Sequence, residues 1–374
     1  MNAPKMIDLF SGCGGISLGA TRAGFELAVA IDTDERALSA HARNFPNAKH
    51  LSLDLSKTSG QQILDAAGLK QGEIDMVVGG PPCQGFSSIG KRDITDSRNQ
   101  RLGDFFRLVN EIKPKAFVVE NVPGILSSRY THIVNAARSL ARDSYHILDP
   151  HRIKAVDAGA PTIRTRVVIV GFLKEKIIPP SDFWANLPNS RNIPPVIRCA
   201  LDGLPFDVNP DPSLSRGGKR TVRVSQKGAF FLSVTGNVPP GVGDQVALND
   251  YLGKHIVTGC IGTRHSAEIE RRYEALAYGE VDSTSKAVRL DPNGYCPTLR
   301  AGTGPDKGSY QAVRPIHYLR PRVITPREAA RLQGFPDWFQ FDETKWHSFR
   351  QLGNSVSPLV AEFVMKKMAN TLGC

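Results

Sequence analysis

Short apolar runs alternate with stretches of helical spacing over the first 175 residues of the chain. The apolar runs, which are typical of buried strands, lie at 5–10, 26–31, 75–80, 116–121 and 166–173. Between them, apolar residues recur every three or four positions, as on one face of a helix, at 14–24, 34–45, 102–112 and 131–143. This alternation predicts an α/β fold with a doubly wound, mostly parallel sheet.

The pattern changes near residue 179. From there to about 320 the chain is rich in proline and glycine, and its strand-like pieces, such as 221–234 and 253–262, are short. This composition predicts a second, smaller domain of irregular, β-rich character.

A helical pattern returns toward the C-terminus. Thr325 suits the N-cap of a helix, Pro326 its first position and Glu328 its third, so that Thr325 and Glu328 form a capping box. Gly334 suits the end of this helix, and a last helix is predicted at 357–373.

The chain is basic. Its 374 residues include 47 Lys and Arg against 36 Asp and Glu, which gives a formal net charge of +11. This balance favours a polyanionic partner such as nucleic acid, and the length favours two domains. The densest basic run, 214–228, has five Lys or Arg and no acid. It is either a nucleic-acid contact or a solvated face.

Several classes of protein and site are disfavoured. No apolar run approaches the roughly 18 residues needed to span a bilayer, and no signal-peptide core begins the chain, so we expect a cytoplasmic protein. No two cysteines form a CxxC pair and no histidine cluster accompanies them, so we expect neither a zinc site nor disulfides, and no metal. The cysteines are Cys13, Cys83, Cys199, Cys260, Cys296 and Cys374.

The ends of the first three predicted strands carry residues suited to a nucleoside. Ligands bind beyond the carboxyl ends of strands in open α/β sheets. The first strand ends in DLFSGCGG, 8–15, where glycines let the backbone approach a ligand. Asp32 ends the second strand, a position that commonly holds ribose hydroxyls, and Asp54 lies where an adenine amino group could be read. The glycine-rich segment could instead be a structural turn, and Asp54 a simple turn aspartate. Together, however, these positions indicate an adenosine-containing cofactor.

A thiol and a carboxyl end the next two strands. Cys83 follows two prolines, which stiffen the chain before the thiol. Glu120 ends an apolar strand, and burial there would raise its pKa and let it donate a proton. Arg164 and Arg166 are two residues apart in an extended segment, so we expect both on one face, where they would favour the thiolate of Cys83.

The ordered set of motifs resembles the DNA (cytosine-5)-methyltransferase family, in its bacterial form. The motifs DLFSGCGG, PPCQGFS, ENVPG, RTR, TPREAARLQGFPD and QLGNSVSP occur in the family's order. The resemblance implies a Rossmann-like methyltransferase sheet in a catalytic domain of residues 1–178 plus 351–374. Residues 179–350 would form the target-recognition domain and hinge, with the helix motif at 323–350 linking back to the catalytic domain.

The family implies S-adenosyl-L-methionine as cofactor and S-adenosyl-L-homocysteine as product. By resemblance, Phe10 stacks near the adenine, Asp32 takes the ribose and Asp54 the adenine edge. Pro81 lines the cofactor side, and the C-terminal segment completes the pocket. The implied cofactor residues are Phe10, Gly12, Gly14, Gly15, Asp32, Asp54, Pro81, Asn354 and Ser355.

The family also implies the chemistry at Cys83. A thiolate that adds at C6 of cytosine makes C5 enamine-like, so that C5 can take the methyl group. Glu120 would contact N3 and the amino group, and its proton at N3 would stabilise the adduct. Arg166 would hold O2. The implied catalytic residues are Cys83, Glu120, Asn121, Arg164 and Arg166.

Double-stranded DNA is the implied partner, with the target base flipped out of the stack. The segment 87–101 is the predicted closing loop. The expected DNA contacts are Ser87, Lys91, Arg92, Arg98, Arg101, Arg216, Lys219, Arg220 and Arg223. The chain is expected to act as a monomer, and physical association with a cognate restriction endonuclease is not required. One residue departs from the family pattern, because Thr162 stands where glutamine is usual.

Two other functions stay open. The first is an RNA methyltransferase of the same fold, although relatives that act on tRNA have a compact target region and about 140 residues intervene here. Methyl transfer to tRNA or to duplex DNA distinguishes it. The second is a non-catalytic DNA-binding module, which would have lost Cys83 or Glu120, whereas both are present.

Overall fold

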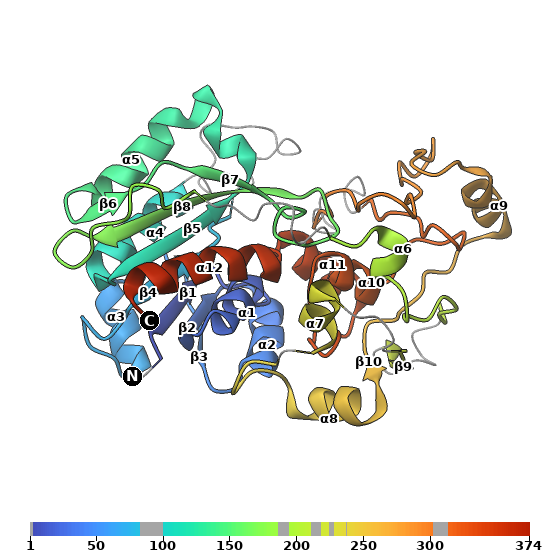
Figure 1. The fold of residues 1–374 in the computed structure, drawn as a ribbon, viewed down its shortest axis with the longest axis horizontal. Helices are drawn as coiled ribbons and strands as arrows, with labels where there is room; N and C mark the ends of the chain where they lie inside the picture. The colour runs from blue at the N-terminus through green and yellow to red at the C-terminus, as the bar shows by residue number, and fades with distance from the viewer. Residues whose placement is uncertain are drawn as a thin grey trace.

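The computed structural model describes residues 3–82, 100–185, 194–210, 218–223, 228–236, 238–301 and 313–374. Among them, eight strands form one sheet, which lies in the left half of the view in Figure 1. The strands are β1 (Lys5–Leu9), β2 (Glu26–Asp32), β3 (Lys49–Ser52), β4 (Met76–Gly79), β5 (Ala116–Asn121), β6 (Tyr145–Ile147), β7 (His151–Lys154) and β8 (Thr165–Leu173).

The sheet order is β3-β2-β1-β4-β5-β8-β6, with β7 paired to β8 as well. The first five strands run parallel to one another, and β8 runs antiparallel to β5, β6 and β7. The predicted mostly parallel sheet is therefore confirmed. The three strands that the apolar pattern did not predict, β3, β6 and β7, have only three or four residues each.

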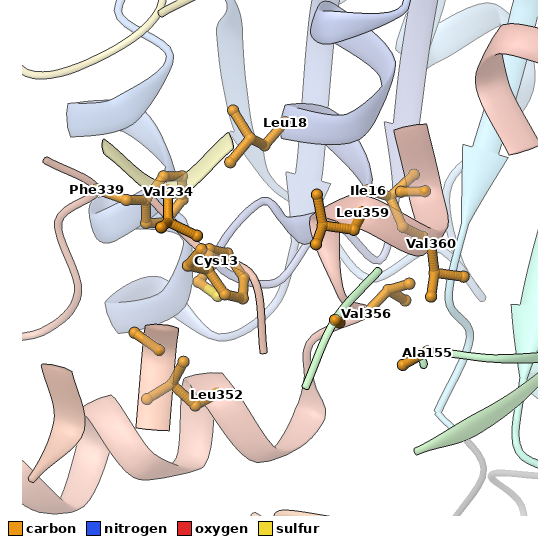
Figure 2. Close-up of a cluster of buried hydrophobic side chains, with 14 of the residues drawn as sticks. Cys13, Ile16, Leu18, Ala155, Val234, Phe339, Leu352, Val356, Leu359 and Val360 are labelled. Atoms are coloured by element: carbon orange, nitrogen blue, oxygen red, sulfur yellow. The ribbon is translucent and has the colours of Figure 1, made fainter. Parts of the chain in front are cut away.

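Helices cover both faces of the sheet, as in a doubly wound fold. They are α1 (Gly15–Arg22), α2 (Glu35–Asn44), α3 (Gly60–Ala67), α4 (Arg101–Ile112), α5 (Thr131–Arg142) and α12 (Pro358–Leu372), with short 3-10 helices at Pro123–Leu126 and Ser128–Tyr130. Alternate strand residues point to opposite faces. Met6 and Val78 join the apolar cluster that contains α1 and α12, whereas Ile7 and Val77 join the cluster with α3, α4 and α5. Figure 2 shows Leu18 of α1 and Val360 of α12 in the first of these clusters. None of these described helices is both long and apolar enough to cross a lipid bilayer.

The second region is more helical than its sequence indicated. Its described elements are α6 (Ile197–Ala200), β9 (Arg220–Thr221), α7 (Ala229–Thr235), α8 (Gln245–Lys254), β10 (Ile256–Val257) and α9 (Ala267–Ala275). Two helices follow this region along the chain, α10 (Pro326–Leu332), which the sequence predicted, and α11 (Lys345–Asn354). In α7, Phe230, Phe231 and Val234 are buried while Leu232 is 67% exposed. That spacing marks one face of a helix, which a short apolar run does not distinguish from a strand. The β-rich character predicted for this region needs correction in its described part.

This second region packs directly on the sheet-covering helices α1 and α12. The apolar cluster of α1 and α12 continues without a break into Phe231, Val234 and Tyr251. The side-chain amide of Asn44 donates to the main-chain oxygen of Gln340 at 2.7 Å, and its oxygen accepts from the Gln340 N–H at 2.9 Å. The proposed domain boundaries stay a prediction, but the two regions share one core.

The capping residues predicted near the C-terminus take up the expected positions. The Thr325 hydroxyl accepts from the Glu328 N–H at 3.2 Å, and the Glu328 carboxylate accepts from the Thr325 N–H at 2.7 Å. Pro326 begins α10, and Gly334 follows its end with φ 83°. Arg322 adds a buried ion pair to Glu328 at 2.8 Å, which fixes the start of the helix.

Candidate active site

The carboxyl ends of four parallel strands meet at one edge of the sheet. Leu9 at the end of β1 pairs with Ile31 of β2 and with Gly79 of β4, and Gly79 pairs in turn with Val119 of β5. The segments that follow these positions carry Phe10, Asp32, Pro81, Glu120 and Asn121. The sequence-predicted residues at the strand ends are therefore brought to the same edge.

The turn after β1 is held by the acid at the end of β2. Asp32 accepts from the Gly12 N–H at 2.8 Å through one oxygen and from the Asp34 N–H at 2.8 Å through the other. Burial raises the pKa of Asp32, and these backbone donors lower it. Gly12 has φ 55°, and Phe10 has φ 61°, which is a strained conformation for an aromatic residue. Strain of this kind is typical of a functional turn.

The C-terminal segment closes on the start of α1. A Cβ at Gly15 would lie 2.2 Å from the main-chain oxygen of Val356 and 2.3 Å from the Ser355 hydroxyl. Only glycine allows the two segments to approach so closely. Ser355 is buried beside this contact, and Asn354 is exposed at the end of α11. The structure thus brings Ser355, which was assigned to the cofactor by resemblance, against the glycine turn.

Replacing Gly15 by alanine is expected to destabilise the fold and weaken cofactor binding together, because the added methyl group would push the 355–356 segment away from the turn. Overpacking of this kind costs about 1–3 kcal/mol of unfolding free energy. Chemical denaturation measures the loss of stability. A Gly103→Ala variant is the matched control, since a Cβ at Gly103 in α4 would meet nothing within 4 Å. Equal stability of the two variants would contradict the close approach.

Arg164 holds the C-terminal segment in place. Its guanidinium donates to the main-chain oxygens of Leu299 at 2.8 Å, Gly353 at 2.9 Å and Ser355 at 2.8 Å. The sequence placed Arg164 and Arg166 side by side toward the thiol. These three carbonyls fix the buried guanidinium of Arg164, and its effect on the thiolate stays a prediction because Cys83 lies outside the described residues. Such long-range bonds leave no local sequence signal.

Arg166 pairs with the carboxyl at the end of β5. Its Nε atom lies 2.5 Å from Oε1 of Glu120, and both side chains are largely buried. Burial raises the pKa of Glu120, and the charges of Arg166 and Arg164 oppose that shift. A Cβ at Gly80 would lie only 3.3 Å from the Glu120 carboxylate. The glycine therefore leaves space beside the acid.

Asn121 forms a hydrogen bond with the turn that leads to Cys83. Its amide donates to the main-chain oxygen of Pro81 at 3.4 Å, and its carbonyl accepts from the Val122 N–H at 2.9 Å. Cys83 itself lies outside the described residues. The position of Asn121 next to Glu120 in β5 therefore links the carboxyl to the segment that carries the thiol.

Thr162 fills the position where the sequence departs from the family pattern. Its hydroxyl donates to the main-chain oxygen of Cys296 at 3.0 Å, and the Ile163 N–H donates to the same oxygen at 2.9 Å. Thr162 is buried. The bonds of Thr162 and Ile163 thus hold the segment 294–299 against the residues just before β8.

The residues predicted to contact DNA are only partly described. Lys219 forms an ion pair with Asp250 at 2.7 Å, and Arg220 donates to the main-chain oxygen of Lys219 at 2.8 Å. Arg223 is exposed after β9. These residues do not lie at the strand edge, and their DNA role stays a prediction. The predicted site residues that fall outside the described part of the chain are Cys83, Ser87, Lys91, Arg92, Arg98 and Arg216.

Asp54 and Arg101, predicted for different ligands, are partners in the structure. The Arg101 guanidinium lies 3.2 Å from Oδ1 of Asp54. Arg101 is the first residue of α4, and Asp54 follows β3. No local pattern indicates this contact, because 47 residues separate the two.

A buried polar chain beneath the glycine turn was also missed. Ser17 donates to Asp8 at 2.6 Å and lies 3.0 Å from Nε2 of His41, whose Nδ1 lies 2.9 Å from Nε2 of His50. Burial raises the pKa of Asp8 to about 7 and lowers that of His41. An acid inside the apolar strand was the available signal, but nothing local connects it to two distant histidines.

The residues at this edge fit an adenosine-containing cofactor. Asp32 and Asp54 are acceptors suited to hydroxyl and amino donors, and Oδ2 of Asp54 receives no donor from any described residue. Phe10 is half-buried beside the turn. In the described part of the chain, no group of three His, Cys, Asp or Glu could hold a metal ion.

Comparisons with known proteins agree with this geometry. A family model described as C-5 cytosine-specific DNA methylase matches residues 4–370. The Type II methyltransferase M.XorII of Xanthomonas oryzae pv. oryzae is 37% identical over an alignment of 368 residues, which covers 97% of this chain and 84% of that protein. M.AgeI of Thalassovita gelatinovora, also a Type II methyltransferase, is 30% identical over an alignment of 430 positions, which covers 98% of this chain and 99% of that protein.

Solved structures share the fold. A crystal structure of a putative DNA modification methyltransferase encoded within an E. coli prophage has a TM-score of 0.87 and 45% identity, with full coverage of both chains. The Dnmt2 methyltransferase of S. pombe has a TM-score of 0.61 at 16% identity over 99% of each chain, a likeness of fold alone.

Proposed function

The chain belongs to the C-5 cytosine-specific DNA methylase family, and from this premise we propose that it transfers a methyl group from S-adenosylmethionine to C5 of a flipped-out cytosine in double-stranded DNA. Its named relatives are Type II methyltransferases, which methylate DNA as part of restriction-modification. The observation that carries the proposal is the buried ion pair of Glu120 with Arg166 at the strand edge, next to the turn that leads to Cys83.

The thiolate of Cys83 is the proposed nucleophile. Its sulfur forms a bond to C6 of the cytosine, and the displaced electron pair makes C5 nucleophilic. When bound, the cofactor supplies the electrophilic methyl group that C5 attacks. A base then removes the C5 proton, the double bond re-forms, and the bond between C6 and the sulfur of Cys83 breaks.

Glu120 is the proposed proton donor to N3. Burial raises the pKa of its carboxyl, and a protonated acid at N3 withdraws electrons from the ring and so favours addition at C6. Arg166 holds Oε1 of Glu120 through Nε, and its Nη1 donates to the main-chain oxygen of Thr165 at 2.8 Å. No described residue accepts from its Nη2 atom, which would donate to cytosine O2.

The burial of Glu120 also supports base flipping. Only 9% of this residue is exposed, so the Watson–Crick edge of a base inside a duplex does not reach its carboxyl. A cytosine that rotates out of the stack brings N3 into the pocket, at a cost of a few kcal/mol for unstacking and unpairing. The space left beside Gly80 lies next to the same carboxylate.

The glycine turn and its two acids would bind the cofactor. Asp32 already orders the turn by accepting from the Gly12 N–H. Because each carboxylate oxygen accepts more than one hydrogen bond, Asp32 would also accept from the ribose hydroxyls. Asp54 would take the adenine amino group. Phe10, held with a positive φ, would present its ring to the adenine.

Methyl transfer to defined nucleic acids tests this proposal. Purified protein with radiolabelled S-adenosylmethionine is expected to label duplex DNA and not tRNA, and bisulfite sequencing of DNA from an expressing host should show 5-methylcytosine at one short sequence. Label on tRNA alone would favour the RNA enzyme of the same fold. Binding of duplex DNA without label on either substrate would favour the non-catalytic module.

A further inference from the structure

Two arginines of α4 hold the loop that follows β3. Arg107 donates to the main-chain oxygens of Leu55 at 2.7 Å and Thr58 at 3.2 Å. Arg101, nearly two turns earlier, lies 3.2 Å from the carboxylate of Asp54. Arg107 therefore fixes the backbone of the loop, whereas Arg101 contacts its acidic side chain.

The contact with Arg101 fixes the orientation of the Asp54 carboxylate. Oδ1 accepts from the Ser56 N–H at 3.1 Å, from the Ser56 hydroxyl at 2.7 Å and from Arg101 at 3.2 Å. These donors lower the pKa of Asp54, so it stays ionised. All three occupy one oxygen, and among the described residues Oδ2 is left as the acceptor for a ligand.

The charges around Arg101 disfavour a phosphate contact. Asp104 accepts from the same Arg101 nitrogen at 3.2 Å, so one guanidinium lies between two carboxylates. Asp104 also approaches Arg107, which is itself paired with Glu111. A DNA phosphate at Arg101 would meet both carboxylates at short range, and the like charges would repel.

We propose that Arg101 is a positioning residue for the adenine of the cofactor, acting through Asp54, and not a DNA-phosphate contact. This assignment replaces the one made from the sequence and rests on the proposed function. Arg101 locks the Asp54 carboxylate so that Oδ2 meets the adenine amino group. Its effect is therefore specific to ligands that carry that amino group.

Binding of two product analogues tests the assignment. S-adenosylhomocysteine carries the amino group, and S-inosylhomocysteine carries an oxygen in its place. By calorimetry, Arg101→Ala is expected to weaken binding of the first about 10-fold, the factor for one hydrogen bond of ordinary strength, and to leave binding of the second unchanged. Arg101→Lys should recover part of the loss. Arg107→Ala, the matched control, should affect both ligands equally.

Three results would overturn the assignment. Equal weakening of both analogues in Arg101→Ala would mean that the residue only supports the fold. Unchanged binding of S-adenosylhomocysteine, with a salt slope for DNA binding smaller by about one unit, would make Arg101 a phosphate contact. If the wild-type protein binds neither S-adenosylhomocysteine nor S-adenosylmethionine, the proposed function itself fails, and this inference fails with it.

Discussion

Replacing Cys83 by serine is expected to abolish methyl transfer while the fold and cofactor binding persist. Only a thiolate adds readily to C6 of cytosine at neutral pH, because a serine hydroxyl is almost entirely protonated there. Loss of a nucleophile reduces turnover by up to about 10⁶-fold in other covalent enzymes, so a loss of about 10⁴-fold or more is expected. Label transfer to duplex DNA measures it, and calorimetry with S-adenosylhomocysteine reports cofactor binding.

Cys374→Ser provides the matched control for this variant. Cys374 is an exposed free thiol at the end of α12, and its replacement should leave turnover unchanged. Turnover of Cys83→Ser within 10-fold of the wild-type value would show that Cys83 is not the nucleophile.

Replacing Glu120 by glutamine is expected to slow methyl transfer about 10²- to 10⁴-fold, which is the usual contribution of one positioned proton transfer. The amide still donates and accepts hydrogen bonds but does not supply a proton to N3. Single-turnover kinetics with saturating DNA measure the step directly. DNA affinity should change much less than the rate.

The pH dependence distinguishes proton donation from simple contact. The pKa of Glu120 is raised above its ordinary value of 4.5, and the protonated form is the active one. The wild-type rate of methyl transfer should therefore fall as pH rises through that raised pKa. The rate of Glu120→Gln should show no such fall over the same pH range. Glu268→Gln, at an exposed position of α9, is the control. A near wild-type rate for Glu120→Gln would place the proton donor elsewhere.

The parts of the site that could be predicted from the sequence are those with local signals. Glu120 is the last residue but one of a six-residue strand that is buried throughout, so its location follows from the apolar run before it. Asp32 ends β2 in the same way. The capping box of Thr325 and Glu328 needs only residues three apart. In each case the neighbours that decide the position are adjacent in the chain.

The parts that could not be predicted depend on contacts between distant segments. Arg164 bonds to Ser355 across 191 residues, and no pattern near Arg164 indicates that its guanidinium turns toward carbonyls. The contact of Arg101 with Asp54 appears only when α4 packs on the loop after β3. α7 was mistaken for a strand because five apolar residues in seven fit either period.

Covalent trapping on duplex DNA tests whether the thiol of Cys83 adds to C6 of the target cytosine. With 5-fluorocytosine at the target position, Cys83 adds to C6 and the methyl group transfers, but the fluorine at C5 does not leave as a proton does. We expect the wild-type protein to form a complex with this DNA that survives denaturing electrophoresis and requires S-adenosylmethionine. The complex should be absent in Cys83→Ser. Under conditions in which ordinary DNA is methylated, absence of this complex, or its formation by Cys83→Ser, would contradict the account.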